Sequence, residues 1–300
     1  MIRHFLRLAD LTATEHQTLR TRAKLLKKER AAGLRHATLA GKTIALVFEK
    51  SSTRTRASFE AGIKQLGGDV LVLDAQGSQL GRGEPIEDTA RVLSSYVDAI
   101  MLRTFGDERL EAFAKFSRVP VINGLSDGAH PVQLLADLQT VDENFGTIDV
   151  PMAFVGDGSS NMARSFVEAA RLFGFLLTIA CPEGYEPPAD EIAAAGGRVR
   201  VVRDPREAVK GVSVVNTDVW TSMGQEAESK KRLAAFAGFT VDGAMMALAA
   251  PDAIVLHCLP AHRGEEISAE VLEGAQSRVW QQAENRMHAQ KALLEILLPT

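Results

Sequence analysis

The sequence predicts an α/β fold of two domains, each a mostly parallel sheet flanked by helices, with the C-terminal helix packing back across the domains. Two observations support this fold class. Short apolar runs alternate with helix-period segments almost to the end of the chain, a pattern typical of parallel strands that are connected by helices. The chain has 300 residues, of which 46% are hydrophobic, so two domains can each bury a core of their own.

The first half of the chain begins with a helical stretch at about residues 12–32. Four apolar runs then have the length of strands: Thr43 to Glu49, Asp69 to Asp74, Ala99 to Arg103, and Pro120 to Asn123. After the first of them, Phe59, Ile63 and Leu66 recur at helical spacing and indicate a helix with one apolar face. A longer helical segment, His130 to Phe145, completes this series.

A second series of strands and helices follows Gly146, where the helical pattern stops and a new strand begins. Its strand candidates are Val150 to Gly156, Phe175 to Cys181, Arg198 to Val202, Val212 to Thr217, and Ala253 to Leu259. We therefore predict a first domain at residues 1–146 and a second domain at residues 147–300. The final helix, at about residues 280–300, is expected to return to the first domain.

Composition and charge indicate a cytoplasmic protein. Only two cysteines, Cys181 and Cys258, are present, which excludes a disulfide framework and fits a reducing compartment. The first ten residues lack the apolar core of a signal peptide, and no later run is apolar enough to span a membrane. The formal net charge is −4, so the basic cluster between Arg20 and Arg30 is interpreted as a solvated helix face and not as a nucleic-acid site.

The segment from Lys50 to Arg56 has the features of a phosphate-binding helix start, because it follows a strand candidate and opens a helical run. Ser52, Thr53 and Thr55 offer hydroxyl groups, and the first-turn amides have no partner inside the helix. Arg54 and Arg56 add fixed positive charges. The segment lacks the glycines of a nucleotide-binding loop, which favours a small phosphate ester or anhydride as the ligand. The alternative is an ordinary capped helix with solvated arginines.

Three further polar residues of the first half are candidates because ligands bind beyond the carboxyl ends of parallel strands. Arg103 ends a strand candidate, where its charge would hold a carbonyl or phosphoryl oxygen. His130 and Gln133 are separated by one helical turn at the start of the long helix, which has Pro131 in its first turn. Each of these residues, taken alone, fits an ordinary surface position equally well.

Polar residues also follow the strands of the second half. The segment from Gly156 to Asn161 follows a strand candidate and leads into a helical run. It lacks the third glycine of a nucleotide-binding fingerprint, which weakens a nucleotide-binding interpretation, and its last residue, Asn161, is a candidate site residue. Asp218 begins a loop that extends to Gly224 and contains a carboxylate, hydroxyls and glycine-exposed amides. These groups suit an amino acid as the ligand, because the Asp218 carboxylate can bind its ammonium group and the backbone amides can bind its carboxylate. The alternative is that Asp218 only caps a helix.

Cys258 follows the last strand candidate and places a thiol at the end of the sheet. Such a thiol serves as a nucleophile, as an orienting group for an amine, or only as a small buried residue. His257, Cys258 and His262 resemble metal ligands, but no second cluster completes a tetrahedral site, so no metal is predicted.

Taken together, these motifs resemble the aspartate/ornithine transcarbamoylase family over nearly the whole chain. The motifs shared with the whole family are Ser52-Thr53-Arg54-Thr55-Arg56, His130-Pro131-Val132-Gln133 and Glu284-Asn285-Arg286, the last of which is expected to open the final helix. Those of its ornithine-using branch are Asp218-Val219-Trp220-Thr221-Ser222-Met223-Gly224 and His257-Cys258-Leu259-Pro260. One departure is visible, because Ser160 and Asn161 stand where the family usually has two asparagines.

The resemblance implies a homotrimer with an active site in the cleft between the domains, near a subunit boundary. The residues that it assigns to carbamoyl phosphate are Ser52, Thr53, Arg54, Thr55, Gln79, Arg103, His130, Gln133, Cys258, Leu259 and Arg286. Those that it assigns to ornithine are Asn161, Asp218, Ser222 and Met223. The residues expected to take part in the chemistry are Cys258, Arg103, His130 and Asp218. No metal, organic cofactor, nucleic acid or membrane is expected as a partner.

The resemblance also implies a reaction. The carbamoyl group of carbamoyl phosphate would move to the side-chain amine of L-ornithine and give L-citrulline and phosphate, a step of arginine biosynthesis. Other members of the family suggest putrescine, an acylated ornithine or aspartate as alternative acceptors. Outside the family, the α/β pattern also fits a nucleotide-dependent dehydrogenase or a non-catalytic protein that binds an amino acid.

Overall fold

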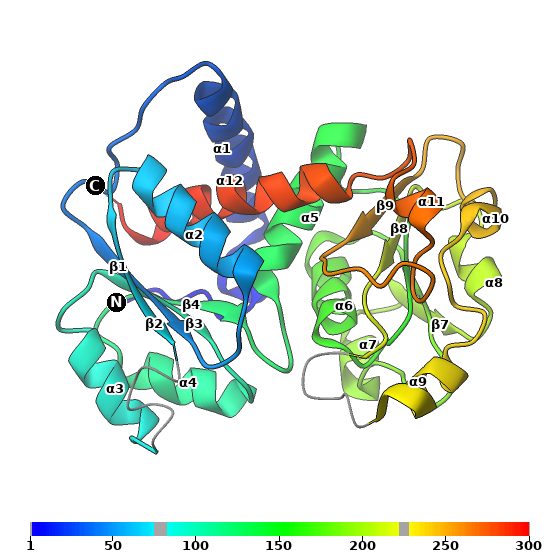
Figure 1. Cartoon of the computed structure of the whole chain (residues 1–300), viewed down its shortest axis with the longest axis horizontal. Helices are drawn as coiled ribbons and strands as arrows, with labels where there is room; N and C mark the ends of the chain where they lie inside the picture. The colour runs from blue at the N-terminus through cyan, green and yellow to red at the C-terminus, as the bar shows by residue number, and fades with distance from the viewer. Residues whose placement is uncertain (1, 75–82, 222–227, 300) are drawn as a thin grey trace. The chain divides into compact units, whose positions relative to one another are not determined.

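The chain consists of two compact units in a computed structural model that describes residues 2–74, 83–221 and 228–299 (Figure 1). The first unit comprises Met1–Gln139 and Glu284–Thr300, and the second comprises Thr140–Ala283. Two helices, α5 (Pro131–Phe145) and α12 (Val279–Leu297), contain the boundaries between the units. Among the described residues, no helix is both long enough and apolar enough to cross a membrane.

The first unit is built on a parallel sheet with the strand order β2-β1-β3-β4. The strands are β1 (Thr43–Phe48), β2 (Asp69–Asp74), β3 (Ala99–Arg103) and β4 (Val121–Leu125). The other elements that lie wholly in this unit are η1 (Leu8–Asp10), α1 (Ala13–Ala31), α2 (Thr53–Gln65), α3 (Ile86–Leu93) and α4 (Asp107–Phe116). Helices α3 and α4 pack on one face of the sheet, and α1 and α2 lie on the other (Figure 1).

The alternation of side chains along each strand explains why both faces need a cover. Ala45 and Val47 of β1 point into the cluster that α3 and α4 complete, while the neighbouring Ile44 and Leu46 are also fully buried. A strand buried on both faces reads as a continuous apolar run, as the sequence of β1 does.

The second unit is built on a parallel sheet with the strand order β7-β6-β5-β8-β9. The strands are β5 (Met152–Val155), β6 (Leu177–Ala180), β7 (Val199–Val202), β8 (Val214–Thr217) and β9 (Ile254–His257). The helices that lie wholly in this unit are α6 (Asn161–Phe173), α7 (Ala189–Ala194), α8 (Pro205–Val209), α9 (Ser229–Ala235), α10 (Gly243–Met246) and α11 (Ala269–Leu272).

In each sheet the chain starts on an inner strand, runs outward to one edge and then returns to the other side. The reversal falls between β1 and β3 in the first unit and between β5 and β8 in the second. Loops diverge at such a reversal and leave room for a ligand at the carboxyl ends of the strands.

The predicted fold class is confirmed, because both sheets are parallel and flanked by helices. All nine predicted strands are present, with ends that differ by two residues or fewer. The predicted apolar helix face is confirmed as well, since Phe59, Ile63 and Leu66 are fully buried. The interpretation of Glu284 as the opening of the last helix is wrong. Helix α12 starts at Val279, so Arg286 lies inside the helix, where regular hydrogen bonding fixes its backbone.

A buried ion pair connects two strand-end loops of the second unit. Arg232 of α9 pairs with Asp157, which follows β5, and its Nε donates to the carbonyl oxygen of Trp220, which follows β8, at 2.5 Å. The other oxygen of Asp157 accepts from the backbone nitrogen and hydroxyl of Ser159, at 2.9 and 2.6 Å. The side chains of the pair are only 5% and 4% exposed, so both charges depend on these partners.

Replacement of Arg232 is therefore expected to destabilise the second unit strongly. Arg232→Met leaves the Asp157 carboxylate buried without its cation, which should lower the free energy of unfolding by about 3–5 kcal/mol. Urea denaturation followed by tryptophan fluorescence measures the change. The matched control is Arg200→Met, because Arg200 pairs with Glu207 on the surface, where the side chains are 59% and 51% exposed. That variant should change stability by less than about 1 kcal/mol. Equal effects of the two substitutions would contradict the importance of the buried pair.

Candidate active site

The start of helix α2 provides an anion-binding group of atoms in the first unit. Strand β1 leads directly into a short loop that ends at Ser52, the residue that caps the helix. The Ser52 hydroxyl accepts a hydrogen bond from the Thr55 backbone nitrogen at 3.3 Å, while Thr53 is the first helical residue and is exposed. The remaining first-turn amides and the positive end of the helix dipole are available to an anion.

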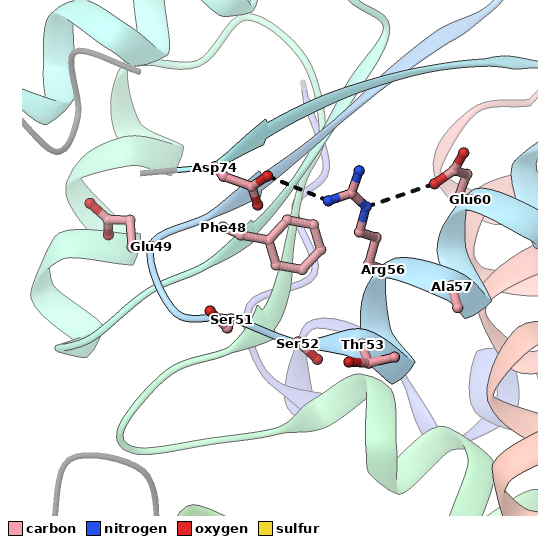
Figure 2. A pocket seen from close by; sticks show the side chains of 9 residues that line it. All are labelled: Phe48, Glu49, Ser51, Ser52, Thr53, Arg56, Ala57, Glu60 and Asp74. Atoms are coloured by element: carbon pink, nitrogen blue, oxygen red, sulfur yellow. Dashed lines mark hydrogen bonds and ion pairs between the residues drawn. The ribbon is translucent and has the colours of Figure 1, made fainter. Parts of the chain in front are cut away.

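A pocket of about 610 Å³ adjoins this helix start (Figure 2). Its lining comes from the end of β1, the following loop, the first two turns of α2 and the end of β2: Phe48, Glu49, Ser51, Ser52, Thr53, Arg56, Ala57, Glu60 and Asp74. The pocket therefore lies at the carboxyl ends of two adjacent parallel strands, where the sequence analysis expected ligand-binding groups.

The two arginines of α2 have different surroundings. The Arg56 guanidinium lies 3.4 Å from a carboxylate oxygen of Asp74 and 3.9 Å from one of Glu60, so its charge is already compensated (Figure 2). Arg54, by contrast, has no carboxylate partner among the residues that the structure describes. Arg54 is consequently the α2 cation that remains available to a bound anion.

A buried hydrogen-bonded group lies beside the first turn of α2. Arg286 of α12 donates from Nη2 to the Thr55 hydroxyl at 2.8 Å and from Nη1 to the side-chain oxygen of Gln133. Thr55, Gln133 and Arg286 are each no more than 2% exposed. The structure thus brings together three predicted site residues, although Arg286 lies more than 150 positions from the other two in the sequence.

His130 and Arg103 are also buried near this group. Arg103 is the last residue of β3 and is 8% exposed, and His130 immediately precedes α5 and is 5% exposed. Burial lowers the pKa of His130 well below its ordinary value, and the positive charges of Arg286, Arg103 and Arg54 lower it further. His130 is therefore a neutral imidazole at neutral pH, and the three guanidiniums that depress its pKa favour an anion.

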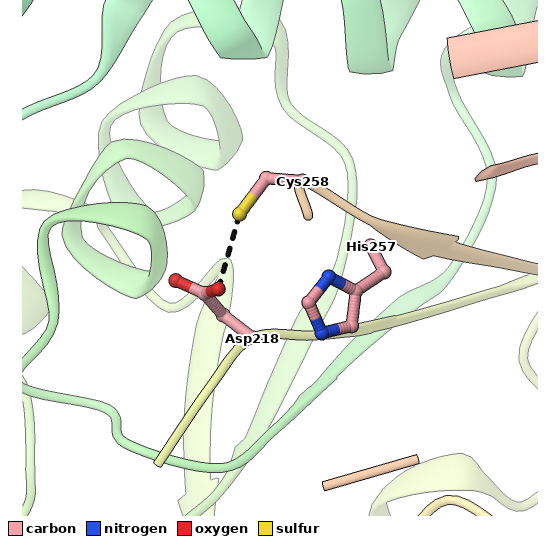
Figure 3. A group of neighbouring side chains, drawn as sticks. All are labelled: Asp218, His257 and Cys258. Atoms are coloured by element: carbon pink, nitrogen blue, oxygen red, sulfur yellow. Dashed lines mark hydrogen bonds between the residues drawn. The ribbon is translucent and has the colours of Figure 1, made fainter. Parts of the chain in front are cut away.

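In the second unit, the register of two neighbouring strands places Asp218 next to Cys258. Thr217 of β8 pairs with His257 of β9, so the residue that follows each strand end lies beside the other. The Cys258 thiol donates a hydrogen bond from Sγ to Asp218 Oδ1 at 3.0 Å (Figure 3). The same oxygen accepts from the Val219 backbone nitrogen at 2.8 Å. The Asp218 carboxylate and the Cys258 thiol therefore form one hydrogen-bonded pair.

Asp218 is only 8% exposed, and its surroundings change its acidity. Burial raises the pKa of its carboxyl group above the ordinary value. The hydrogen bonds from Cys258 and Val219 oppose this shift without cancelling it. The carboxylate is consequently a better proton acceptor than an exposed aspartate.

His257 supports the loop that carries Cys258. Its Nδ1 accepts a hydrogen bond from the Leu259 backbone nitrogen at 2.8 Å, so its proton lies on Nε2 and is directed to Glu266 Oε1, at 3.0 Å. Leu259 has a φ angle of 60°, which is uncommon for a residue with a side chain, and the contact from its nitrogen to His257 stabilises that conformation. Both His257 and Glu266 are almost completely buried.

Two groups of side chains have the composition of metal ligands within the described ranges. In the first, Asp218, His257 and Cys258 have potential ligand atoms within 4.8 Å of one another. The second consists of His262, Glu265 and Glu266. In the first group both ring nitrogens of His257 already have hydrogen-bond partners, so ligation would break the contacts that shape the loop. The arrangement suits proton handling better than metal binding.

Four further residues were predicted to belong to the site. Asn161 is half-buried at the start of α6, directly after the capping Ser160. Gln79, Ser222 and Met223 lie outside the described residues. The contacts of Asp137 with Gln133 and of Glu266 with His257 were not predicted from the sequence. Asp137 lies four residues after Gln133 on one helix, a spacing that signals contact, whereas nothing in the sequence connects Glu266 to His257.

Comparison with known proteins relates both units to one family. The family model described as "Aspartate/ornithine carbamoyltransferase, carbamoyl-P binding domain" matches residues 3–143. The model described as "Aspartate/ornithine carbamoyltransferase, Asp/Orn binding domain" matches residues 149–297. Together the two matches cover nearly the whole chain.

Individual relatives agree with these matches. The ornithine carbamoyltransferase of Pelobacter propionicus is 56% identical, over 99% of this chain and 99% of its own. The anabolic ornithine carbamoyltransferase of Pseudomonas aeruginosa is 54% identical, over 99% of this chain and 97% of its own. Among solved structures, the ornithine carbamoyltransferase from Pyrococcus furiosus has a TM-score of 0.93 and 48% identity, and the match covers 99% of this chain and 97% of that one.

The raised pKa of Asp218 predicts a pH-dependent effect on stability. A carboxyl group whose pKa is higher in the folded state contributes stability below its ordinary pKa of 3.8, and this contribution is lost as the pH rises through the raised value. Asp218→Asn, which keeps an oxygen for Cys258 and Val219, removes that loss. The melting temperature of the variant relative to the wild type should therefore increase between pH 4 and pH 8, as measured by scanning calorimetry. A difference that is constant with pH would contradict the shift.

Proposed function

Because the chain belongs to the aspartate/ornithine carbamoyltransferase family, we propose that it is an ornithine carbamoyltransferase. It transfers the carbamoyl group of carbamoyl phosphate to the side-chain amine of L-ornithine, giving L-citrulline and phosphate. The observation that carries this proposal is the hydrogen-bonded pair of Cys258 and the buried Asp218, since it supplies a proton acceptor for an amine. The names of the relatives that match along their whole length support ornithine as the acceptor.

Carbamoyl phosphate is proposed to bind at the start of α2. Its phosphate accepts hydrogen bonds from the first-turn amides and the hydroxyls of Ser52 and Thr53, and its charge is balanced by Arg54. The other proposed contacts are Thr55, Gln79, Arg103, His130, Gln133, Cys258, Leu259 and Arg286. Because the leaving group is already an activated phosphate, the reaction needs neither a metal nor an organic cofactor.

The carbonyl oxygen gains negative charge when the amine attacks. Arg103 and the neutral His130 are proposed as hydrogen-bond donors to this oxygen, together with the Thr55 hydroxyl. Thr55 is suited to the role because its oxygen already accepts from Arg286, which leaves its proton available for donation. One such donor is typically worth about 3 kcal/mol of transition-state stabilisation. The tetrahedral intermediate then collapses and expels phosphate, and the second proton of the attacking nitrogen passes to an oxygen of the leaving phosphate.

The acceptor amine must lose a proton before it attacks. A free amine of this type has a pKa of about 10. Asp218 is proposed to accept the proton, with Cys258 orienting the amine, while Asn161, Ser222 and Met223 bind the rest of ornithine. Because the thiol donates a hydrogen bond to Asp218, Cys258 is proposed as an orienting group and not as a nucleophile.

The proposal extends to assembly and biological role. We propose a cytoplasmic homotrimer, with active sites near the subunit boundaries, that functions in arginine biosynthesis. The anabolic relative from Pseudomonas aeruginosa supports the biosynthetic direction. Both cysteines are free, in agreement with a reducing compartment. Light scattering of the purified protein should give a mass three times that of the 32.4 kDa chain.

The assay that tests the function measures citrulline formed from L-ornithine and carbamoyl phosphate. Putrescine, an acylated ornithine and aspartate serve as competing acceptors in the same assay. Citrulline formation with a clear preference for ornithine is the expected outcome. A well-folded protein that forms no citrulline would rule the proposal out, and a preference for another acceptor would reassign the protein within its family.

The two neighbouring arginines of α2 provide a matched test of the phosphate site. Arg54→Ala should lower kcat/KM for carbamoyl phosphate by at least about 100-fold, because a cation next to the leaving phosphate is lost. Arg56→Ala is the control, since its guanidinium is already paired with Asp74 and Glu60. Initial-rate kinetics with varied carbamoyl phosphate separate the two variants. Similar losses in both would show that Arg54 has no special part in binding.

The thiol provides a second test. Cys258→Ala should raise KM for ornithine and lower kcat by roughly 10- to 100-fold, since Asp218 loses a hydrogen-bond donor and the amine loses an orienting group. Cys181→Ala is the control. Cys181 is buried, and burial raises its pKa to about 11, so this thiol should be inert and its loss should leave kcat unchanged. Mass spectrometry of the wild type during turnover should detect no carbamoyl or phosphoryl group on Cys258, and finding one would make it a nucleophile.

A further inference from the structure

A chain of three buried polar side chains lies behind the start of α2. The Gln133 amide donates from Nε2 to Asp137 Oδ1 at 2.7 Å, and its oxygen accepts from Arg286 Nη1. Asp137 is 1% exposed, Gln133 is fully buried and Arg286 is 2% exposed. Water therefore contributes little to satisfying the Gln133 amide, and its two protein partners determine how it points.

The chemistry of these partners permits only one orientation of the amide. A guanidinium can only donate hydrogen bonds, and an aspartate carboxylate can only accept them. If the Gln133 amide were rotated by half a turn, its nitrogen would face Arg286 and its oxygen would face Asp137. One hydrogen bond would be replaced by a contact between two donors and the other by a contact between two acceptors. Such contacts between buried groups are energetically costly.

Only one of the two partners can maintain this orientation throughout a catalytic cycle. Arg286 also donates to Thr55 at the proposed phosphate site, so a bound phosphate competes for its guanidinium. Asp137 has a different position. It lies one turn beyond Gln133 on helix α5, so the regular backbone keeps the two residues within contact distance, and no hydrogen bond connects Asp137 to Thr55 or Ser52 among the described contacts.

We propose that Asp137 is a positioning residue that keeps the oxygen of the Gln133 side chain directed toward the carbamoyl group, and that it thereby makes the site selective for an acyl phosphate with an amino group. The proposal rests on carbamoyl phosphate being the substrate. The oxygen of Gln133 accepts a hydrogen bond from the carbamoyl NH₂ group. Acetyl phosphate, which has a methyl group at that place, offers this oxygen no hydrogen-bond donor and gains nothing from it.

The test replaces Asp137 by asparagine in the full-length enzyme. The side-chain amide that Asp137→Asn introduces can donate to the oxygen of Gln133, so the Gln133 amide can rotate by half a turn. The NH₂ group of Gln133 would then face the NH₂ group of carbamoyl phosphate. For this variant, kcat/KM for carbamoyl phosphate should fall by about 10- to 100-fold. The inhibition constant of acetyl phosphate, measured against carbamoyl phosphate, should change by less than about threefold, so discrimination between the two ligands decreases. A general packing defect would weaken both ligands equally, and that result would overturn the proposal.

A compensating variant keeps the proposal testable even if Asp137→Asn does not fold. In Gln133→Glu/Asp137→Asn the carboxylate and the amide exchange places, so the net charge and shapes are preserved. A carboxylate presents an acceptor oxygen in either orientation, and discrimination against acetyl phosphate should therefore return to near the wild-type ratio. Loss of discrimination in this double variant would overturn the proposal. Absence of citrulline formation by the wild type would instead refute the proposed function, so the two failures are distinguishable.

Discussion

The first unit depends on the buried guanidinium of Arg286. A positive charge that is 2% exposed is tolerated only where hydrogen-bond acceptors surround it, and Thr55 of α2 and Gln133 of α5 are two of its acceptors. These contacts join three helices whose residues lie far apart in the chain. The last helix must therefore pack against α2 and α5 before the candidate site at the start of α2 has its full shape, so this site depends on tertiary folding and not on a local loop alone.

Opposite electrostatic conditions prevail in the two units. In the first, the positive charges of Arg54, Arg103 and Arg286 add to the effect of burial and keep His130 neutral, so the group attracts an anion without adding an acidic proton. In the second, burial makes Asp218 a stronger base than usual, and a thiol is its hydrogen-bond donor. Transfer of an acyl group from a phosphate to an amine needs both conditions, since the leaving group is anionic and the nucleophile must be deprotonated.

Local patterns were sufficient to predict the elements and to select candidate site residues. The apolar runs and the helical spacing of Phe59, Ile63 and Leu66 depend on near neighbours, so strands and helices could be predicted to within about two residues. The final helix was predicted from about residue 280 and starts at Val279, so the motif from Glu284 to Arg286 lies inside the helix and does not open it. Side-chain partners could not be predicted, as the different surroundings of Arg54 and Arg56 and the contact of His257 with Glu266 show, because they depend on residues brought close only by folding.

The parallel register of β8 and β9 has a consequence for how such a protein can vary over evolution. Asp218 and Cys258 meet only because Thr217 and His257 are ladder partners. A single insertion within either strand would reverse the side-chain alternation and replace one member of the pair with a neighbour that points away. Insertions in the long segment that connects the two strands leave that pairing intact. Changes in sequence length are therefore expected in the parts of this connection that lie outside α9 and α10, and not inside the strands.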